Sequence, residues 1–165
     1  MKKIKYSNAL SMLNQKGFSL IELIIILVII GIMIAASSSR LKDITTNARV
    51  GASINQITGD IDQAKTISMS MRSQIQIIFN KDNETYTIYK DGILYNDFPG
   101  SENGIVNLLG DDNNGEVDIT SVSLNGSNTL TFDKWGNCLQ NGTIVLNNDR
   151  QIQIKNLTGH WEIIN

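Results

Sequence analysis

The feature that most constrains this chain is an apolar run near its start, KGFSLIELIIILVIIGIMIAA over residues 16–36. From Phe18 to Ala36 the run holds 19 residues. As a helix, a run of this length extends about 28 Å, close to the hydrocarbon thickness of a bilayer. Between Phe18 and Ala36 the one ionisable side chain is Glu22, which is costly in hydrocarbon, so we expect that carboxylate to have a partner. The run therefore predicts a membrane-spanning helix over residues 18–36.

The boundary at the start of this run separates three interpretations. An ordinary signal anchor needs no carboxylate, and a secretory signal peptide is cut at small residues after its apolar core, here Ala35, Ala36 and Ser37. In this chain a polar leader ends at Gly17, the apolar run begins at once with Phe18, and Glu22 stands four residues further on. The motif GFSLIEL resembles the type IV prepilin signature.

This resemblance implies a processing route and a set of partners. In that family a membrane-embedded prepilin peptidase cuts after the glycine, here Gly17, and methylates the new amino terminus, here Phe18. Glu22 is then expected to pair with the α-amine of a neighbouring subunit, because each charge is less costly in lipid when paired. The implied partners are other pilins or pseudopilins, the prepilin peptidase, a membrane platform protein and the cytoplasmic membrane, with no cofactor.

The distribution of charge predicts the orientation of the chain. Lys2, Lys3, Lys5 and Lys16 lie in the leader, which has no acidic residue, although the formal net charge of the whole chain is −2. A basic flank keeps its end of a membrane helix in the cytoplasm. We therefore expect a single-pass protein of the cytoplasmic membrane with an extracytoplasmic C-terminal domain, found after assembly in a cell-surface or periplasmic filament. The acidic remainder gives no support for general nucleic-acid binding.

The pattern of apolar residues predicts a leader over residues 1–17, a helix over 18–72 and an extracytoplasmic β domain over 73–165. Beyond Arg40, apolar residues recur at three- and four-residue spacing, which is typical of an amphipathic helix lying on a sheet. These residues are Leu41, Ile44, Ala48, Val50, Ile54, Ile57, Ile61, Ala64 and Met71. Coiled-coil pairing is a competing interpretation of the same stripe.

Beyond Ser73 the apolar period changes to two, which is typical of β-strands. Turn residues such as Asn125-Gly126, Asn148-Asp149 and Thr158-Gly159 separate the apolar runs. Strands are predicted over residues 74–80, 85–90, 116–124, 129–133, 142–147, 151–155 and 161–164, with a loop-rich middle over 96–115. The expected fold class is α+β: a long N-terminal helix followed by an antiparallel β-sandwich-like domain, as in type IV pilins.

The C-terminal part of the chain carries a second resemblance. The segments FDKWGNCLQNGTIVLNN and RQIQIKNLTGHWEII are similar to the C-terminal sheet of the H-type minor pseudopilins. His160 stands where that group often has an arginine. The similarity implies a long N-terminal helix that carries its β domain at the tip of a filament.

One acidic turn is a weak calcium candidate. Asp111, Asn113, Glu116 and Asp118 offer oxygen ligands, but they lack the twelve-residue spacing of a complete calcium-binding loop. A solvated turn is the favoured interpretation.

The remaining candidate residues favour structural roles over catalysis. Cys138 is the only cysteine, so no intrachain disulfide can form, and we expect it to be packed. His160 is the only histidine, which leaves no imidazole cluster for a catalytic triad or a metal site. Trp135, Tyr95 and Phe98 are expected in the core, as aromatic residues at strand spacing usually are. An enzyme is not predicted.

The sequence thus favours a structural subunit, a minor pilin or pseudopilin of a type IV pilus, a type II secretion system or a DNA-uptake machine. The alternative is a monomeric, membrane-anchored extracellular binding protein. Glu22 distinguishes the two, because a simple tether gains nothing from a carboxylate inside the membrane.

Overall fold

The computed structural model describes residues 17–109 and 117–164, without the side chains of residues 37–43. The predicted leader up to residue 16 lies outside the described residues. The chain divides into two compact units, Met1–Leu41 and Lys42–Asn165.

Helix α1 extends over Leu20–Met71. Its first backbone hydrogen bonds run from the amides of Glu22 and Leu23 to the carbonyl of Ser19, at 3.0 and 3.2 Å. Ser19 is therefore the N-cap residue, and the helix begins two residues after the predicted start. The helix ends because Arg72 adopts a left-handed φ of 51°, and the Ser73 amide donates back to the Ser68 carbonyl at 3.2 Å.

The described part of the first unit is the N-terminal portion of α1. All its large apolar side chains from Phe18 to Ile34 are exposed, with exposed fractions of 44–78%. The sequence predicts that residues 18–36 span a membrane. In the described part of the chain, no helix is both long enough and apolar enough to cross a membrane.

The first sheet of the second unit has five antiparallel strands in the order β3-β2-β1-β6, with β4 also paired to β2. The strands are β1 (Ile75–Asn80), β2 (Thr85–Lys90), β3 (Ile93–Leu94), β4 (Ile105–Asn107) and β6 (Thr129–Phe132). Strands β1 and β2, predicted over residues 74–80 and 85–90, form an antiparallel hairpin with Asn80 opposite Thr85.

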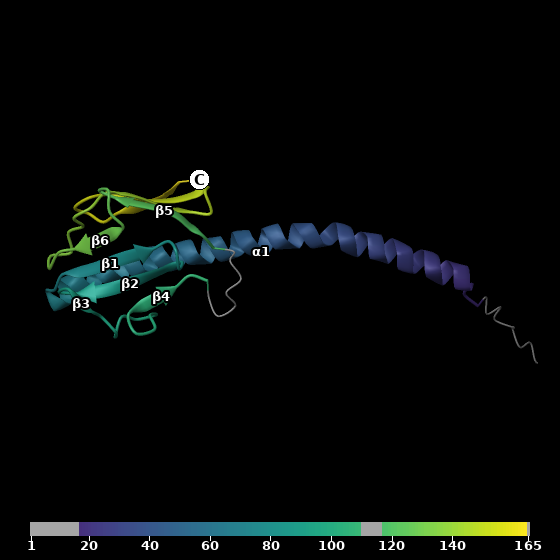
Figure 1. The fold of residues 1–165 in the computed structure, drawn as a ribbon, viewed down its shortest axis with the longest axis horizontal. Helices are drawn as coiled ribbons and strands as arrows, with labels where there is room; N and C mark the ends of the chain where they lie inside the picture. Colours follow the sequence, from purple (N-terminus) through teal and green to yellow (C-terminus); the bar gives the residue numbers. More distant parts are fainter. Residues whose placement is uncertain (1–16, 110–116, 165) are drawn as a thin grey trace, which may run out of the picture. The chain divides into compact units, whose positions relative to one another are not determined.

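The second sheet has four antiparallel strands in the order β5-β7-β8-β9 and forms a separate layer of the domain (Figure 1). These strands are β5 (Ile119–Leu124), β7 (Gly142–Leu146), β8 (Arg150–Ile154) and β9 (Trp161–Ile164). Asn125 and Gly126 after β5 both have positive φ, 51° and 81°, which is the geometry of a type I′ turn. The predicted α+β class, a helix followed by antiparallel sheets, is confirmed.

The core of the second unit combines the helix stripe with side chains from both sheets. On α1 the buried apolar residues are Val50, Ile54, Ile57, Ile61 and Ala64, each at most 4% exposed. They share one cluster with the alternate, inward residues of the strands. The sheet-packing interpretation of this stripe is confirmed from Val50 to Ala64.

The stripe is shorter than the sequence predicts. Ile44, Ala48 and Met71 are exposed, although they continue its three- and four-residue spacing. Spacing alone does not show where the underlying sheets end. The loop-rich middle predicted over 96–115 also differs, because the short strand β4 pairs there with β2. The short strand β3, just before that range, also pairs with β2 and was not predicted.

Candidate functional site

The candidate processing site lies immediately before α1. Gly17 and Phe18 are exposed and outside the helix, so the peptide bond between them is in accessible, non-helical backbone. A Cβ atom built on Gly17 would have no neighbour within 4 Å. The described structure therefore does not itself require glycine at this position, and any such requirement would come from a partner enzyme.

Glu22 lies in the first turn of α1 with an exposed side chain. A carboxylate there is favoured by the partial positive charge of the helix start. Side chains three and four positions away are its neighbours on a helix. These belong to Phe18, Ser19, Ile25 and Ile26, so the same stretch of helix offers Glu22 no cation. A full charge to neutralise this carboxylate must come from elsewhere, such as a free chain terminus or another molecule.

The sequence reasoning missed the role of Ser19. This residue is the N-cap, and Glu22 stands three residues later at position N3. The spacing Ser-x-x-Glu ahead of an apolar run is the capping-box signature, which would have indicated the helix start. Ser19 therefore fixes where the helix begins relative to Glu22.

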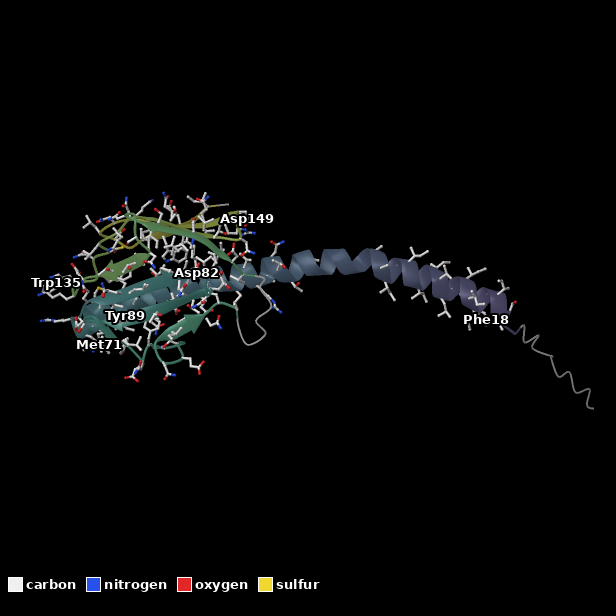
Figure 2. The ribbon with its side chains drawn as sticks, in the orientation of Figure 1. Phe18, Met71, Asp82, Tyr89, Trp135 and Asp149 are labelled. Atoms are coloured by element: carbon white, nitrogen blue, oxygen red, sulfur yellow. The ribbon has the colours of Figure 1, made fainter. Side chains whose placement is uncertain are left out.

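The exposed part of α1 presents apolar side chains in every direction around the helix, with Phe18 at its start (Figure 2). A helix that is apolar all round is normally buried in protein or lipid. An apolar N-terminal helix segment with one carboxylate in its first turn, followed by a domain of antiparallel sheets, is consistent with a type IV pilin-like organisation.

Comparison with known proteins agrees with that class. Residues 12–38 match the family model described as the prokaryotic N-terminal methylation motif. This match covers Gly17, Phe18 and Glu22 and supports a pilin- or pseudopilin-type precursor. Prepilin peptidase and other pilins are the partners that such a motif implies. No curated protein and no solved structure matches the chain.

The calcium candidate is only partly described. Asp111, Asn113 and Glu116 lie outside the described residues. The carboxylate of Asp118 accepts a hydrogen bond from the Thr120 hydroxyl at 2.8 Å, so its position is explained by a local contact. Within residues 17–109 and 117–164, no group of three or more histidine, cysteine or acidic residues is arranged to hold a metal ion.

Cys138 is buried, as expected for a packed residue. Its thiol donates to the Gln140 carbonyl at 3.1 Å, and burial raises the pKa of the thiol. A neutral, buried thiol is a poor nucleophile. His160 is exposed and lies 3.6 Å from the Glu162 carboxylate, measured from Nε2. Neither residue has the surroundings of a catalytic group.

Of the three aromatic residues expected in the core, Phe98 is buried, Tyr95 is partly buried and Trp135 is 61% exposed. The prediction is wrong for Trp135 because a local turn holds it outside the sheets. The side-chain amide of Asn137 donates to the Asp133 carboxylate at 2.9 Å, and the backbone amides of Trp135 and Asn137 donate to it at 2.8 and 2.9 Å. The side-chain bond first, and then the backbone bonds, hold the pKa of that carboxyl below its usual range. Trp135 lies at one end of the second unit, toward which Met71 also projects (Figure 2).

Proposed function

We propose that this chain is a minor pilin or pseudopilin, a structural subunit that is processed after Gly17, methylated at Phe18 and assembled into a filament. The filament belongs to a type IV pilus, a type II secretion system or a DNA-uptake machine. The observation that carries the proposal is the wholly exposed apolar surface from Phe18 to Ile34. A surface of this size favours burial against lipid or other subunits.

In this proposal the precursor is anchored at the cytoplasmic membrane by residues 18–36, and its outer domain lies on the extracytoplasmic side. The basic leader supports that orientation. After processing, Glu22 pairs with the new α-amine of a neighbouring Phe18. That pairing also sets the axial register, because displacing one helix by a turn would leave both charges unpaired in an apolar environment. The H-type minor pseudopilins are the proposed subgroup, supported by the glycine and strand spacing of the C-terminal segments.

The processing step is tested by intact mass of the chain from cells that carry a prepilin peptidase. We expect a mature chain that begins at Phe18 with one added methyl group. Gly17→Val should leave the precursor uncut, because a β-branched side chain hinders an extended backbone from entering a narrow peptidase site. The matched control is Ala36→Val, which blocks the site of the signal-peptide alternative. Normal cutting of Gly17→Val, with loss of cutting in Ala36→Val, would reject the proposal.

The assembly step is tested by Glu22→Ala, measured in sheared filament fractions at equal membrane levels. We expect membrane attachment and leader cleavage to persist while incorporation falls at least tenfold, because the neighbour's ammonium is left without its counter-charge. Glu22→Gln keeps the shape of the side chain and removes its charge, so incorporation of this variant should fall to a similar extent. Glu102→Gln, an exposed acid of the outer domain, is the matched control and should assemble normally.

Incorporation of Glu22→Ala at the level of the unchanged chain, with every partner tested, would show that this carboxylate has no role in assembly. The tethered binding protein would then be the better interpretation.

A further inference from the structure

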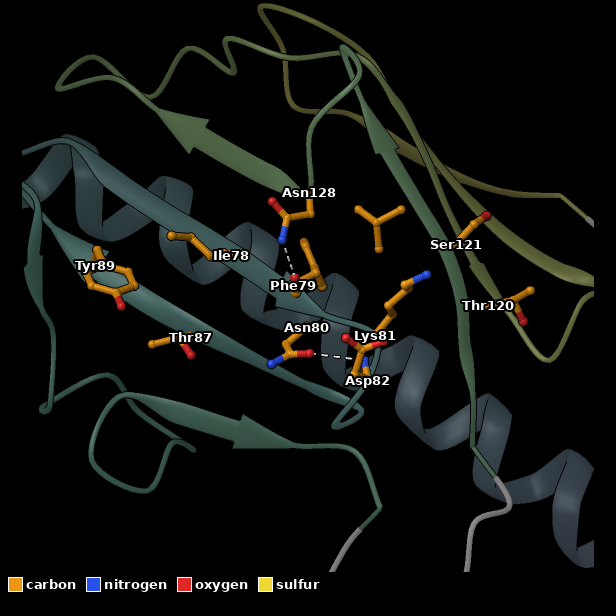
Figure 3. A pocket seen from close by; sticks show the side chains of 11 residues that line it. Ile78, Phe79, Asn80, Lys81, Asp82, Thr87, Tyr89, Thr120, Ser121 and Asn128 are labelled. Atoms are coloured by element: carbon orange, nitrogen blue, oxygen red, sulfur yellow. Dashed lines mark hydrogen bonds between the residues drawn. The ribbon is translucent and has the colours of Figure 1, made fainter.

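A groove lies on the second unit where the outer surface of the β1–β2 hairpin faces strand β5 (Figure 3). Its volume is about 490 Å³, within the range of about 300–1,000 Å³ that is usual for ligand sites. Ile78, Thr87 and Tyr89 line it from the first sheet, and Thr120, Ser121 and Val122 line it from β5. The groove therefore combines a floor of mixed polar and apolar side chains with the border of a second sheet.

Strand β5 is at the edge of its sheet, so it pairs with β7 on one side only. The alternation of an antiparallel ladder shows which backbone groups face the groove. Leu124 exchanges both of its backbone hydrogen bonds with Ser127, at 2.9 and 3.1 Å, on the side away from β7. Val122 stands two residues earlier in the same register, so its N–H and C=O also point away from β7, toward the groove.

Among the described residues, the free edge of β5 is limited to this one position. At one end the Leu124–Ser127 pair occupies the edge. At the other end the Glu84 carboxylate, from the β1–β2 turn, accepts a hydrogen bond from the Ile119 amide at 2.5 Å. Thr120, between Ile119 and Ser121, is the extra residue of a β-bulge. So short an edge cannot template sheet-to-sheet aggregation, but it can still form one two-bond bridge with a guest strand.

The contact of Glu84 with Ile119 also shows that this edge pairs with an acceptor from outside its own sheet. Unlike protected edges, β5 (ITSVSL) carries no charged side chain and no proline that would prevent a guest from pairing. Two charged side chains line the groove, Lys81 and Asp82. The ammonium end of Lys81 extends across the groove toward β5 (Figure 3). A carboxylate on the guest would complement it.

We propose that this groove binds an extended peptide segment by β-strand addition at Val122, with an acidic side chain of the peptide placed against Lys81. One residue of the guest donates its N–H to the Val122 carbonyl and accepts from the Val122 N–H. The flanking guest side chains lie over Ile78 and Tyr89. This inference rests on the groove alone and is independent of the proposed assembly function.

The probe is a fluorescein-labelled peptide, acetyl-Thr-Val-Glu-Val-Thr-amide, titrated against the full chain in non-ionic detergent and followed by fluorescence polarisation. Threonine and valine favour extended backbone. The decisive series methylates the peptide at each backbone nitrogen in turn. We expect about a tenfold weaker affinity when the methylated nitrogen faces Val122 and little change at the adjacent positions, because only alternate N–H groups face the edge.

Variants of the chain test the two halves of the contact separately. Val122→Pro removes the donor that faces the groove and leaves the ladder to β7 intact, so we expect about tenfold weaker binding. Lys81→Ala should weaken binding about two- to fivefold, and replacing the peptide glutamate by glutamine should cancel that difference. The matched control is Lys134→Ala, an exposed lysine that does not line the groove.

Should Val122→Pro fail to fold, the methylated peptides measured on the unchanged chain still decide the question. Equal affinity for all methylated peptides, or no saturable binding up to millimolar concentration, would overturn the proposal. The proposal would also be overturned if the chain formed a dimer that Val122→Pro dissociates and that the peptide does not dissociate. The groove would then be an interface between two copies of the chain.

Discussion

Replacing Tyr86 by phenylalanine is the sharpest test of how helix α1 is joined to the first sheet. The Tyr86 hydroxyl donates to a carboxylate oxygen of Asp60 at 2.5 Å, and the two residues are only 1% and 9% exposed. Tyr86→Phe keeps the ring volume and deletes only this donor. A buried hydrogen bond to a charged group contributes about 1.5–3 kcal/mol, so we expect a loss of that size in the free energy of unfolding at pH 7.

The pH dependence identifies the carboxylate as the cause. Burial raises the pKa of Asp60, and the hydrogen bond from Tyr86 partly offsets that rise. The folded state therefore holds this proton more tightly than the unfolded chain does. The stability due to protonation is fully present below the unfolded pKa and is lost as pH rises through the higher, folded pKa. Without the Tyr86 hydroxyl the pKa of Asp60 in the folded state rises further. The loss in the free energy of unfolding caused by Tyr86→Phe should therefore be largest near pH 7 and about 1 kcal/mol or less near pH 4.

The assay is urea unfolding of the full chain in detergent, followed by tryptophan fluorescence at both pH values. Tyr89→Phe is the matched control, because Tyr89 is half-exposed on the outer face of the same strand, and it should change stability by less than about 0.5 kcal/mol. Asp60→Asn keeps an acceptor for Tyr86 without the charge and should be at least as stable as the unchanged chain at pH 7. An equal loss for Tyr86→Phe at both pH values would refute this reasoning.

Three further predictions concern the packing of the second unit. Ile57→Ala should lower the free energy of unfolding by about 2–5 kcal/mol, whereas Gln56→Ala on the exposed side of the same helix should change it by less than about 0.5 kcal/mol, both by urea titration. Gly142→Ala should lower the free energy of unfolding by about 3 kcal/mol or more in the same titration, because the added Cβ would overlap the Ser123 carbonyl. Gly126→Ala should lower it by only about 1–2 kcal/mol, because Gly126 has φ 81° but open space around it. Cys138 should react with a thiol reagent at pH 8 at least tenfold more slowly in the folded chain than in urea, since its thiol is buried and its pKa is raised, and equal rates would contradict that burial.

The candidate site could be located from the sequence because the chemistry of that site is local. Gly17, Phe18 and Glu22 lie within six residues of each other, and their motif needs no tertiary contact to be recognised. The capping relation between Ser19 and Glu22 is equally local and was open to the same reasoning. Most strands were also predictable, because a period of two and a turn dipeptide are properties of short segments.

Properties that depend on contacts between distant segments came only from the tertiary structure. The helix stripe becomes buried at Val50 and not at Ile44, because the position of the sheets decides where an apolar spacing is covered. Tyr86 reaches Asp60, 26 residues away, and the Glu84 carboxylate reaches the edge of a different sheet at Ile119. The groove beside Val122 has no signal in the sequence, since it exists only where two sheets built from separate segments face each other. Local periodicity determines which residues can form an element, and only packing determines which surfaces of that element remain free to bind.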